Sequence, residues 1–193
     1  MTFRQKLGGA GGLWVLLTAQ AMADGYFLQA DVGGRNQTAV ATASRDALSY
    51  GLSISDYDGG RSGAVSLTYA LPPVRGAVVK LGPTVGLRRT DDDSGTDVTP
   101  GVKATVERYT PTSFGATYLL ADVSSVHRSW FVLGQVSFAP ANIGLELSRG
   151  GSDDYRETTL AMQKRLSDTP FSLRLGYKLS SDELFAGFSV NTF

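Results

Sequence analysis

His127 and Ser129, in the stretch VHRSW, have the residue types and the spacing of a base and a nucleophile. An imidazole takes the proton of a serine hydroxyl when a carboxylate holds the imidazole in the right tautomer. Glu146 or Glu157 would supply that carboxylate. The chemistry would be acyl transfer, but a histidine and a serine two positions apart have little specificity as a motif unless their structural context also fits.

The same residues resemble the His-x-Ser motif of lipid A deacylases, some of which are small outer-membrane barrels. The resemblance implies that His127 is the base, Ser129 the nucleophile and Glu146 the orienting carboxylate, with lipid A as the substrate. The chain departs from the family at Trp130, which replaces the asparagine that usually follows the serine. The alternation described below also places His127 and Ser129 away from lipid. We therefore expect a solvated loop histidine and a protein that is not an enzyme.

Composition argues against several other kinds of site. Cysteine is absent, which rules out disulfides, thiolate metal ligands and a cysteine nucleophile.

The run DDDSGTD (91–97) is acidic but lacks the glutamate and the flanking helices of a calcium loop, so we expect a solvated connection there. No metal and no cofactor are expected. The 18 basic and 18 acidic residues form no long block of one sign, which argues against nucleic-acid binding.

The first 23 residues have the three parts of a cleavable secretory signal. Arg4 and Lys6 make the start basic, an apolar stretch follows, and the small residues Ala21 and Ala23 mark the cleavage site. The apolar stretch is shorter than the roughly 20 residues that a membrane-spanning helix needs. We predict a signal peptide at 1–23 and one exported domain at 24–193.

The exported domain alternates apolar and polar residues with a period of two, which predicts β-strands. In the stretch FSLRLGYKL (171–179), Leu173 and Leu175 share one face, and Ser172 and Arg174 share the other. No window has a convincing helical period, so we expect very little helix. The same alternation is found at 48–55, 102–107 and 143–148.

Two classes of connection take turns between these strands. A transmembrane barrel predicts such an asymmetry, because short turns lie at one end and longer polar loops at the other. Ten strands follow residue 47, and residues 25–46 either add one more pair or cap the barrel. We predict an all-β fold: a closed antiparallel transmembrane β-barrel of 10–12 strands. The acidic, Gly-rich and Ser-rich class comprises 56–61, 91–97, 124–127, 150–154 and 180–183, and the Pro-containing class comprises 72–76, 110–113, 139–142 and 167–170.

If the apolar face meets lipid, the opposite face lines the lumen. Rings of charge set the selectivity of pores, so an excess of basic residues would favour anions, whereas paired charges could instead fill a plugged scaffold. Ten to twelve strands fall between the filled lumen of about eight strands and the aqueous channel of sixteen or more, so both interpretations stay open. The alternation predicts six basic and three acidic lumen-lining residues, namely Lys80, Arg88, Lys103, Glu107, Glu146, Glu157, Arg165, Arg174 and Lys178.

The chain ends on the strand LFAGFSV and stops at Phe193. This ending resembles that of small bacterial outer-membrane β-barrel proteins, whose last strand commonly ends in Phe and is read by the machinery that inserts barrels. The resemblance implies Phe188, Val190 and Phe193 as the insertion signal. Phe193 has the opposite parity from Phe188, so either a β-bulge near Asn191 shifts the register or the signal is imperfect.

Aromatic residues near the strand ends predict the interfacial girdles of a membrane barrel. They are Tyr69, Tyr109, Trp130, Phe138, Tyr155, Phe171, Tyr177 and Phe185.

These patterns predict a protein of the bacterial outer membrane. Its expected partners are outer-membrane lipid and lipopolysaccharide, the barrel-insertion machinery, and small anionic solutes. Its expected function is that of a restricted pore for small or anionic solutes, or of a structural element of the envelope. A secreted, soluble β-sandwich or a lipocalin-like binding protein would have similar strands, but its apolar face would be buried in a core. A surface interaction protein is a further class, which the short loops disfavour.

Overall fold

The structure is a computed structural model, and it describes residues 24–92, 95–153 and 155–193. The predicted signal peptide, together with Asp93, Ser94 and Asp154 of the acidic connections, lies outside the described residues. The described residues form twelve strands and two short 3₁₀ turns, η1 (Val126–Arg128) and η2 (Ala139–Ala141). The strands are β1 (Gly25–Gly33), β2 (Gln37–Arg45), β3 (Leu48–Tyr57), β4 (Gly60–Ala70), β5 (Val78–Thr90), β6 (Asp97–Thr112), β7 (Gly115–Ser124), β8 (Trp130–Phe138), β9 (Ile143–Gly151), β10 (Arg156–Arg165), β11 (Phe171–Lys178) and β12 (Glu183–Asn191).

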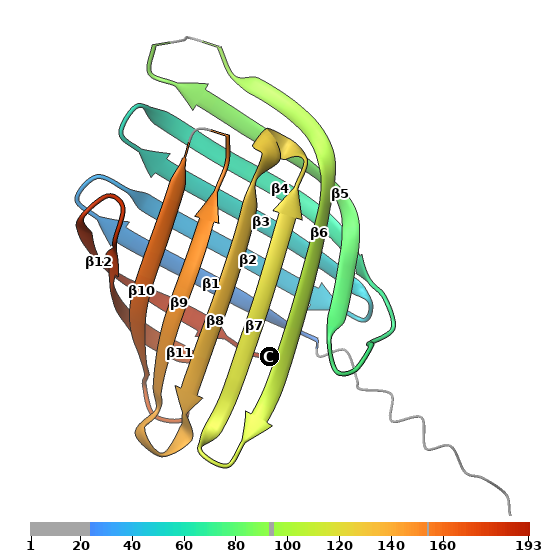
Figure 1. Cartoon of the computed structure of the whole chain (residues 1–193), viewed down its shortest axis with the longest axis vertical. Coiled ribbons are helices and arrows are strands. Elements are labelled where there is room, and N and C mark those ends of the chain that lie inside the picture. The colour runs from blue at the N-terminus through green and yellow to red at the C-terminus, as the bar shows by residue number, and fades with distance from the viewer. Residues whose placement is uncertain (1–23, 93–94, 154) are drawn as a thin grey trace, which may run out of the picture.

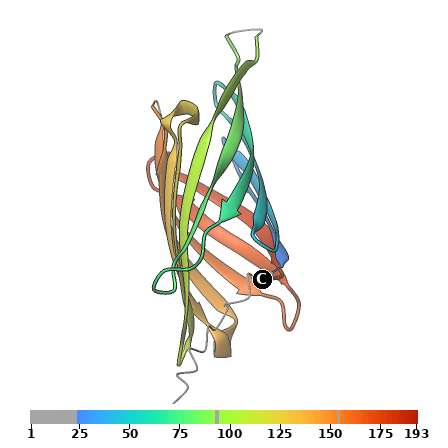
Figure 2. The same cartoon turned by 90° about the vertical axis from the view of Figure 1, so that its right-hand side faces the viewer.

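The strands close into one antiparallel barrel in which each strand pairs with its neighbours in sequence (Figures 1 and 2). The closing seam joins β1 to β12, with Phe27 opposite Asn191 and Gly33 opposite Phe185. Residues 25–46, whose alternation is the weakest in the sequence, form β1 and β2 and are part of the wall. The prediction of a closed antiparallel barrel is confirmed, and the strand count is twelve.

The outer face of the barrel is apolar and the inner face is polar. Leu145 and Leu147 on β9 are exposed on the outside, whereas Glu146 and Ser148 between them are buried inside. No large side chain among the described residues is fully buried, so the barrel has no apolar core of the kind that a lipocalin or a β-sandwich needs. The soluble alternatives are therefore wrong, because the apolar side chains face outward, where a membrane barrel meets lipid.

Neither of the short helical turns among the described residues is long and apolar enough to cross a membrane.

The two ends of the barrel differ in the residue types of their connections, but the predicted difference in length is wrong, since 58–59 at one end is as short as 113–114 at the other. One end, called here the terminal end, carries both ends of the barrel sequence and the Pro-containing turns, such as 71–77 and 139–142. The opposite end, called here the acidic end, carries the connections that follow odd-numbered strands, such as 58–59 and 179–182. In Figure 1 the C-terminus lies in the lower half of the view, and β5 and β6 reach toward the top.

The last strand reaches its end without a β-bulge. Pairing between β12 and β1 is continuous from Phe185 to Asn191, so the bulge expected near Asn191 is absent from this pairing. The strand ends at Asn191, but the next residues keep its register against β1, since Thr192 donates its N–H to the Tyr26 carbonyl at 3.0 Å. Phe193 then lies over Gly25, where an added Cβ would stand 2.8 Å from the ring. The register is therefore not shifted, and Phe193 keeps the parity opposite to that of Phe188.

Candidate functional site

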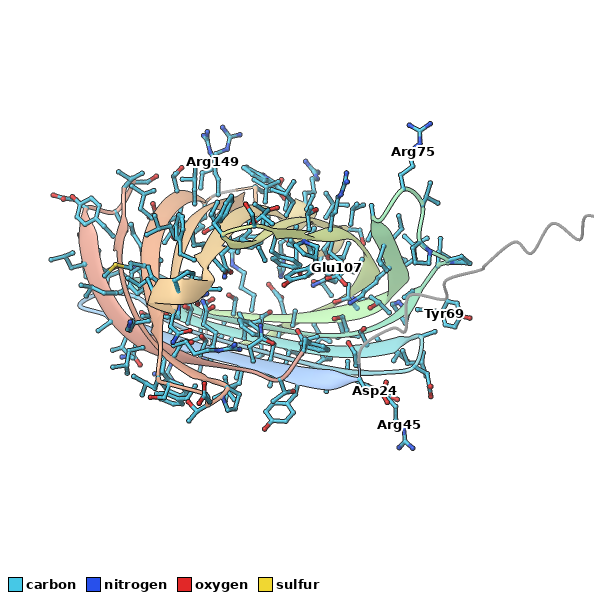
Figure 3. The ribbon with its side chains drawn as sticks, turned by 90° about the horizontal axis from the view of Figure 1, so that it is seen from below. Asp24, Arg45, Tyr69, Arg75, Glu107 and Arg149 are labelled. Atoms are coloured by element: carbon cyan, nitrogen blue, oxygen red, sulfur yellow. The ribbon has the colours of Figure 1, made fainter. Side chains whose placement is uncertain are left out.

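The lumenal wall is the candidate site, because it gathers most of the predicted charged residues. Glu146, Glu157, Arg174 and Lys178 are buried on the inner face, and Lys80, Arg88, Lys103 and Glu107 are partly buried there. Figure 3, viewed from below, shows Glu107 pointing into the interior, whereas Arg149 and Arg75 point away from it. Arg165 pairs with the inward-facing Ser172, but its side chain is exposed near the terminal end.

Arg174 on β11 is the centre of a buried cluster. Its Nε donates to Asp31 Oδ1 on β1 at 3.1 Å, and its Nη1 donates to Glu146 Oε2 on β9 at 3.0 Å. Gln163 Oε1 accepts from the same Nη1 at 3.4 Å. Two carboxylates and an amide therefore satisfy the guanidinium, as a buried charge requires. Ser148 donates to Glu146 at 3.4 Å and extends the network along β9.

The inner face of β5–β7 carries a second set of charges, in two ion pairs. Lys80 Nζ lies 2.6 Å from Glu107 Oε1, and Lys103 Nζ lies 2.9 Å from Asp122 Oδ2. Tyr118 donates its hydroxyl to Glu107 Oε2 at 3.0 Å, and Thr105 donates to Asp122 Oδ2 at 2.8 Å.

These two sets differ in their access to solvent. The side chain of Arg174 is 2% exposed, whereas those of Lys80 and Lys103 are 15% and 30% exposed and those of Glu107 and Asp122 are 23% and 17% exposed. The Arg174 cluster therefore packs its part of the lumen closely, and water reaches the wall at β5–β7. We call Lys80, Lys103, Glu107 and Asp122 the open wall.

Glu183 fixes the connection between β1 and β2 at the acidic end. Its Oε1 accepts from the backbone N–H groups of Arg35 and Asn36, the latter at 3.1 Å, and its Oε2 accepts from Asn36 Nδ2 at 2.7 Å. Lys178 Nζ lies 3.9 Å from Glu183 Oε2 and 5.9 Å from the centre of the Phe185 ring. Phe185 is buried inside the barrel, so its assignment to an interfacial girdle is wrong.

Glu157 has a matching role beside the connection between β11 and β12. It accepts from the backbone N–H groups of Ser180 at 2.7 Å and Ser181 at 3.1 Å. Tyr155 lies next to it in the connection 152–155, where burial and the charges of Glu157 and Glu183 raise the pKa of Tyr155 to about 12. The two glutamates are therefore anchors for hairpins at the acidic end.

Four inward-facing carboxylates were missed by the sequence reasoning: Asp31, Asp122, Glu183, and Asp97, which pairs with Arg88 at the start of β6. They raise the acidic residues on the described inner face from the predicted three to seven, against the six basic ones (Lys80, Arg88, Lys103, Arg165, Arg174 and Lys178). Asp31 lies in the weakly alternating stretch 25–46, Asp122 follows the unbroken apolar run YLLA, and Glu183 was assigned to a turn. Val123 faces outward, so strict alternation from Val123 would have placed its neighbour Asp122 on the inner face.

The candidate acyl-transfer residues do not form a hydrogen-bonded set in the described structure. Ser129 Oγ donates to the Val126 carbonyl at 3.0 Å, and Glu146 is engaged by Arg174. His127 Nε2 is buried without a hydrogen-bond partner among the described residues. η1 leans inward, because Val126 lies against the positions where Gly86 and Gly101 have no side chain. None of the described hydrogen bonds links His127 to Ser129 or Glu146.

Comparisons with known proteins agree on the fold. No family model matches the chain, and no curated protein matches it in sequence. Two solved structures of similar shape are described as "KdgM porin" and "KdgM porin in complex with disordered oligogalacturonate". Each superposes with a TM-score of 0.50 over 88% of this chain and 99% of the other, at 10% and 9% identity respectively. The likeness shows a shared fold, a closed antiparallel β-barrel.

Proposed function

We propose that this protein is a restricted passage for small hydrophilic solutes through the bacterial outer membrane. The observation that carries the proposal is the solvent access of the open wall, where Lys80, Lys103, Glu107 and Asp122 keep 15–30% of their side-chain surface exposed inside the closed barrel. A lumen filled throughout, as expected of a scaffold, would bury these charges as completely as Arg174.

The predicted signal peptide and the apolar outer face support placement in the outer membrane. A spanning barrel needs an apolar outer band, and these strands supply it. The chain ends, with the Pro-containing turns beside them, would face the periplasm, and the acidic end would face outward.

Anionic solutes fit this passage as ligands of the exposed lysines. Lys103, at 30% exposure, is more accessible than Lys80, at 15%. A bound anionic group would compete with Glu107 and Asp122 for Lys80 and Lys103. We therefore propose that the passage prefers anions to cations only weakly. One KdgM porin structure contains an oligogalacturonate, which is a carboxylate-bearing oligosaccharide, and this supports acidic sugars as a class to test.

The test is single-channel recording in planar bilayers with the purified full chain. A passage predicts discrete conductance steps. The alternative, a structural element of the envelope, predicts a band that shifts on heating, which shows a folded barrel, but no steps. A folded barrel that shows no conductance steps would therefore overturn the proposal.

A further inference from the structure

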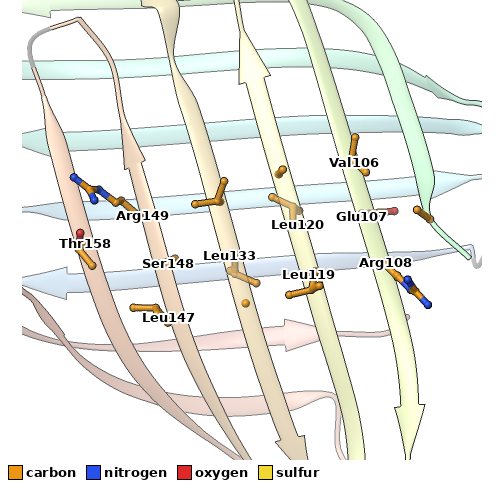
Figure 4. A pocket seen from close by; sticks show the side chains of 14 residues that line it. Val106, Glu107, Arg108, Leu119, Leu120, Leu133, Leu147, Ser148, Arg149 and Thr158 are labelled. Atoms are coloured by element: carbon orange, nitrogen blue, oxygen red, sulfur yellow. The ribbon is translucent and has the colours of Figure 1, made fainter.

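A shallow groove of about 710 Å³ crosses the outer wall from β6 to β10 (Figure 4). Its floor is the backbone of a row of residues whose own side chains point inward: Glu107, Leu120, Leu133 and Ser148. Its two sides are the neighbouring rows of outward side chains, so the groove faces the lipid and not the lumen. We call it the outer groove.

The middle of the outer groove is apolar and lined by small residues. Ala121 belongs to the row that also contains Val132, and Gly134 to the row that also contains Leu147. A Cβ added at Gly134 would meet only Leu119 Cδ2, at 3.6 Å. The absence of larger side chains at Ala121 and Gly134 is what deepens the groove at this place.

The outer groove runs across the strands, with an arginine toward each of its two ends (Figure 4). Arg149, at one end, is the third residue from the close of β9 and so lies near the acidic end. Arg108, at the other, is the fifth residue from the close of β6, nearer the terminal end. The Arg149 end of the groove is therefore the end that opens toward the acidic end of the barrel.

Beyond Arg149 lies a cluster of outward-facing donors. Trp130, Gly151 and Arg156 form one row across β8–β10, and a Cβ at Gly151 would stand 3.0 Å from Arg156 Cγ and 3.3 Å from Trp130 Nε1. Arg149 is the diagonal neighbour of Arg156, and diagonal pairs lie about 7–8 Å apart, within reach of long side chains. Neither guanidinium has a hydrogen bond or a salt bridge with any described residue.

We propose that the outer groove and this cluster bind one lipid with a phosphate headgroup, its phosphate between Arg149 and Arg156 and an acyl chain in the groove. Guanidinium groups bind phosphate through paired N–H donors, and the indole N–H of Trp130 is a further donor at the interface. The apolar middle of the groove suits a hydrocarbon chain. The proposal depends on the membrane placement proposed above, but not on conductance.

The test uses the full chain, purified from outer membranes in detergent, and native mass spectrometry with two probes. One probe is diphosphoryl lipid A, and the other is the same lipid after both phosphates are removed. We expect the protein to retain the phosphorylated probe preferentially. The double variant Arg149→Gln/Arg156→Gln should weaken its binding roughly 10- to 30-fold, since each arginine near a membrane surface contributes about 1 kcal/mol.

The matched control is Arg45→Gln/Arg75→Gln, which removes two arginines that point outward at the terminal end (Figure 3) and should leave binding unchanged. A second variant, Gly134→Leu, fills the groove while both arginines remain and should also weaken binding. A heat-shifted gel band shows that each variant is folded. Equal binding of both probes, or unchanged binding by both the double variant and Gly134→Leu, would overturn the proposal. Retained lipid without conductance would overturn the passage alone.

Discussion

Arg174 on β11 donates to Glu146 on β9 across the full width of β10, at 3.0 Å. In the other direction the same guanidinium reaches Asp31 on β1 across β12, at 3.1 Å. The second reach passes over Gly187, where any side chain would collide with the Asp31 carboxylate. One arginine thus links side chains of four strands, β9, β10, β11 and β1, and spans the seam at which the barrel closes.

Replacing Arg174 with methionine should destabilise the barrel by about 3–5 kcal/mol, because Asp31 and Glu146 would remain buried without a cation. The measurement is the temperature at which the gel band of the folded barrel disappears. The triple variant Arg174→Met/Asp31→Asn/Glu146→Gln removes the stranded charges as well and should recover most of the loss. A single variant as stable as the parent would contradict the proposed role.

Replacing Glu183 with alanine should loosen the connection between β1 and β2. The backbone N–H groups of Arg35 and Asn36 would lose their shared acceptor, at a cost of about 1–3 kcal/mol, which corresponds to roughly 5- to 150-fold faster hydrogen exchange at these amides. The connection at 58–59 has no contact with Glu183 and is the internal control. Unchanged exchange at Arg35 and Asn36 would show that the carboxylate is not their anchor.

Changing the charge of the open wall should change ion selectivity. The variant Glu107→Gln/Asp122→Asn leaves Lys80 and Lys103 without their carboxylates, so the reversal potential in a salt gradient should move toward anion preference. Lys80→Gln/Lys103→Gln should move it toward cation preference. Arg75→Gln, which alters an exposed arginine in a turn at the terminal end, should move it in neither direction. Shifts of the same sign in both double variants would be incompatible with passage along this wall.

Replacing Phe193 with alanine should reduce insertion without destabilising the barrel that does insert. The residue lies beyond β12 and its side chain is half exposed, so its loss should cost the folded state no more than about 0.5 kcal/mol. Phe188→Ala is the contrasting variant: it lies within the strand, stacks on Phe171 at 5.5 Å and should lower stability as well. The readouts are the yield in outer membranes and the heat shift. An undiminished yield of Phe193→Ala would argue against a terminal insertion signal.

Much of the fold follows from local pattern. Alternation assigns Leu145, Glu146 and Leu147 to their faces, and the chemistry of the connections assigns the two ends of the barrel, because each of these signals is local in sequence. The site is less local. The partners Arg174 and Asp31 are separated by 143 residues, and only closure of the barrel brings them together.

The balance of lumenal charge shows the same limit. The predicted excess of cations rested on strands with clear alternation, whereas Asp31 and Asp122 follow apolar or weakly alternating stretches that hide their parity. Which charges face open water and which are packed, as for Lys103 and Arg174, depends on the side chains across the lumen.

Because the chain contains no cysteine, single cysteines can report on each side of the wall, and one adjacent pair tests the passage most directly. Lys103 faces the lumen and Val102, its neighbour, faces outward with 66% exposure. The measurement is single-channel current before and after a charged, water-soluble methanethiosulfonate reagent. Lys103→Cys should lose current on modification, whereas Val102→Cys, facing lipid, should not respond. An unresponsive Lys103→Cys channel, or an equal response from both variants, would contradict solute passage along the inner face.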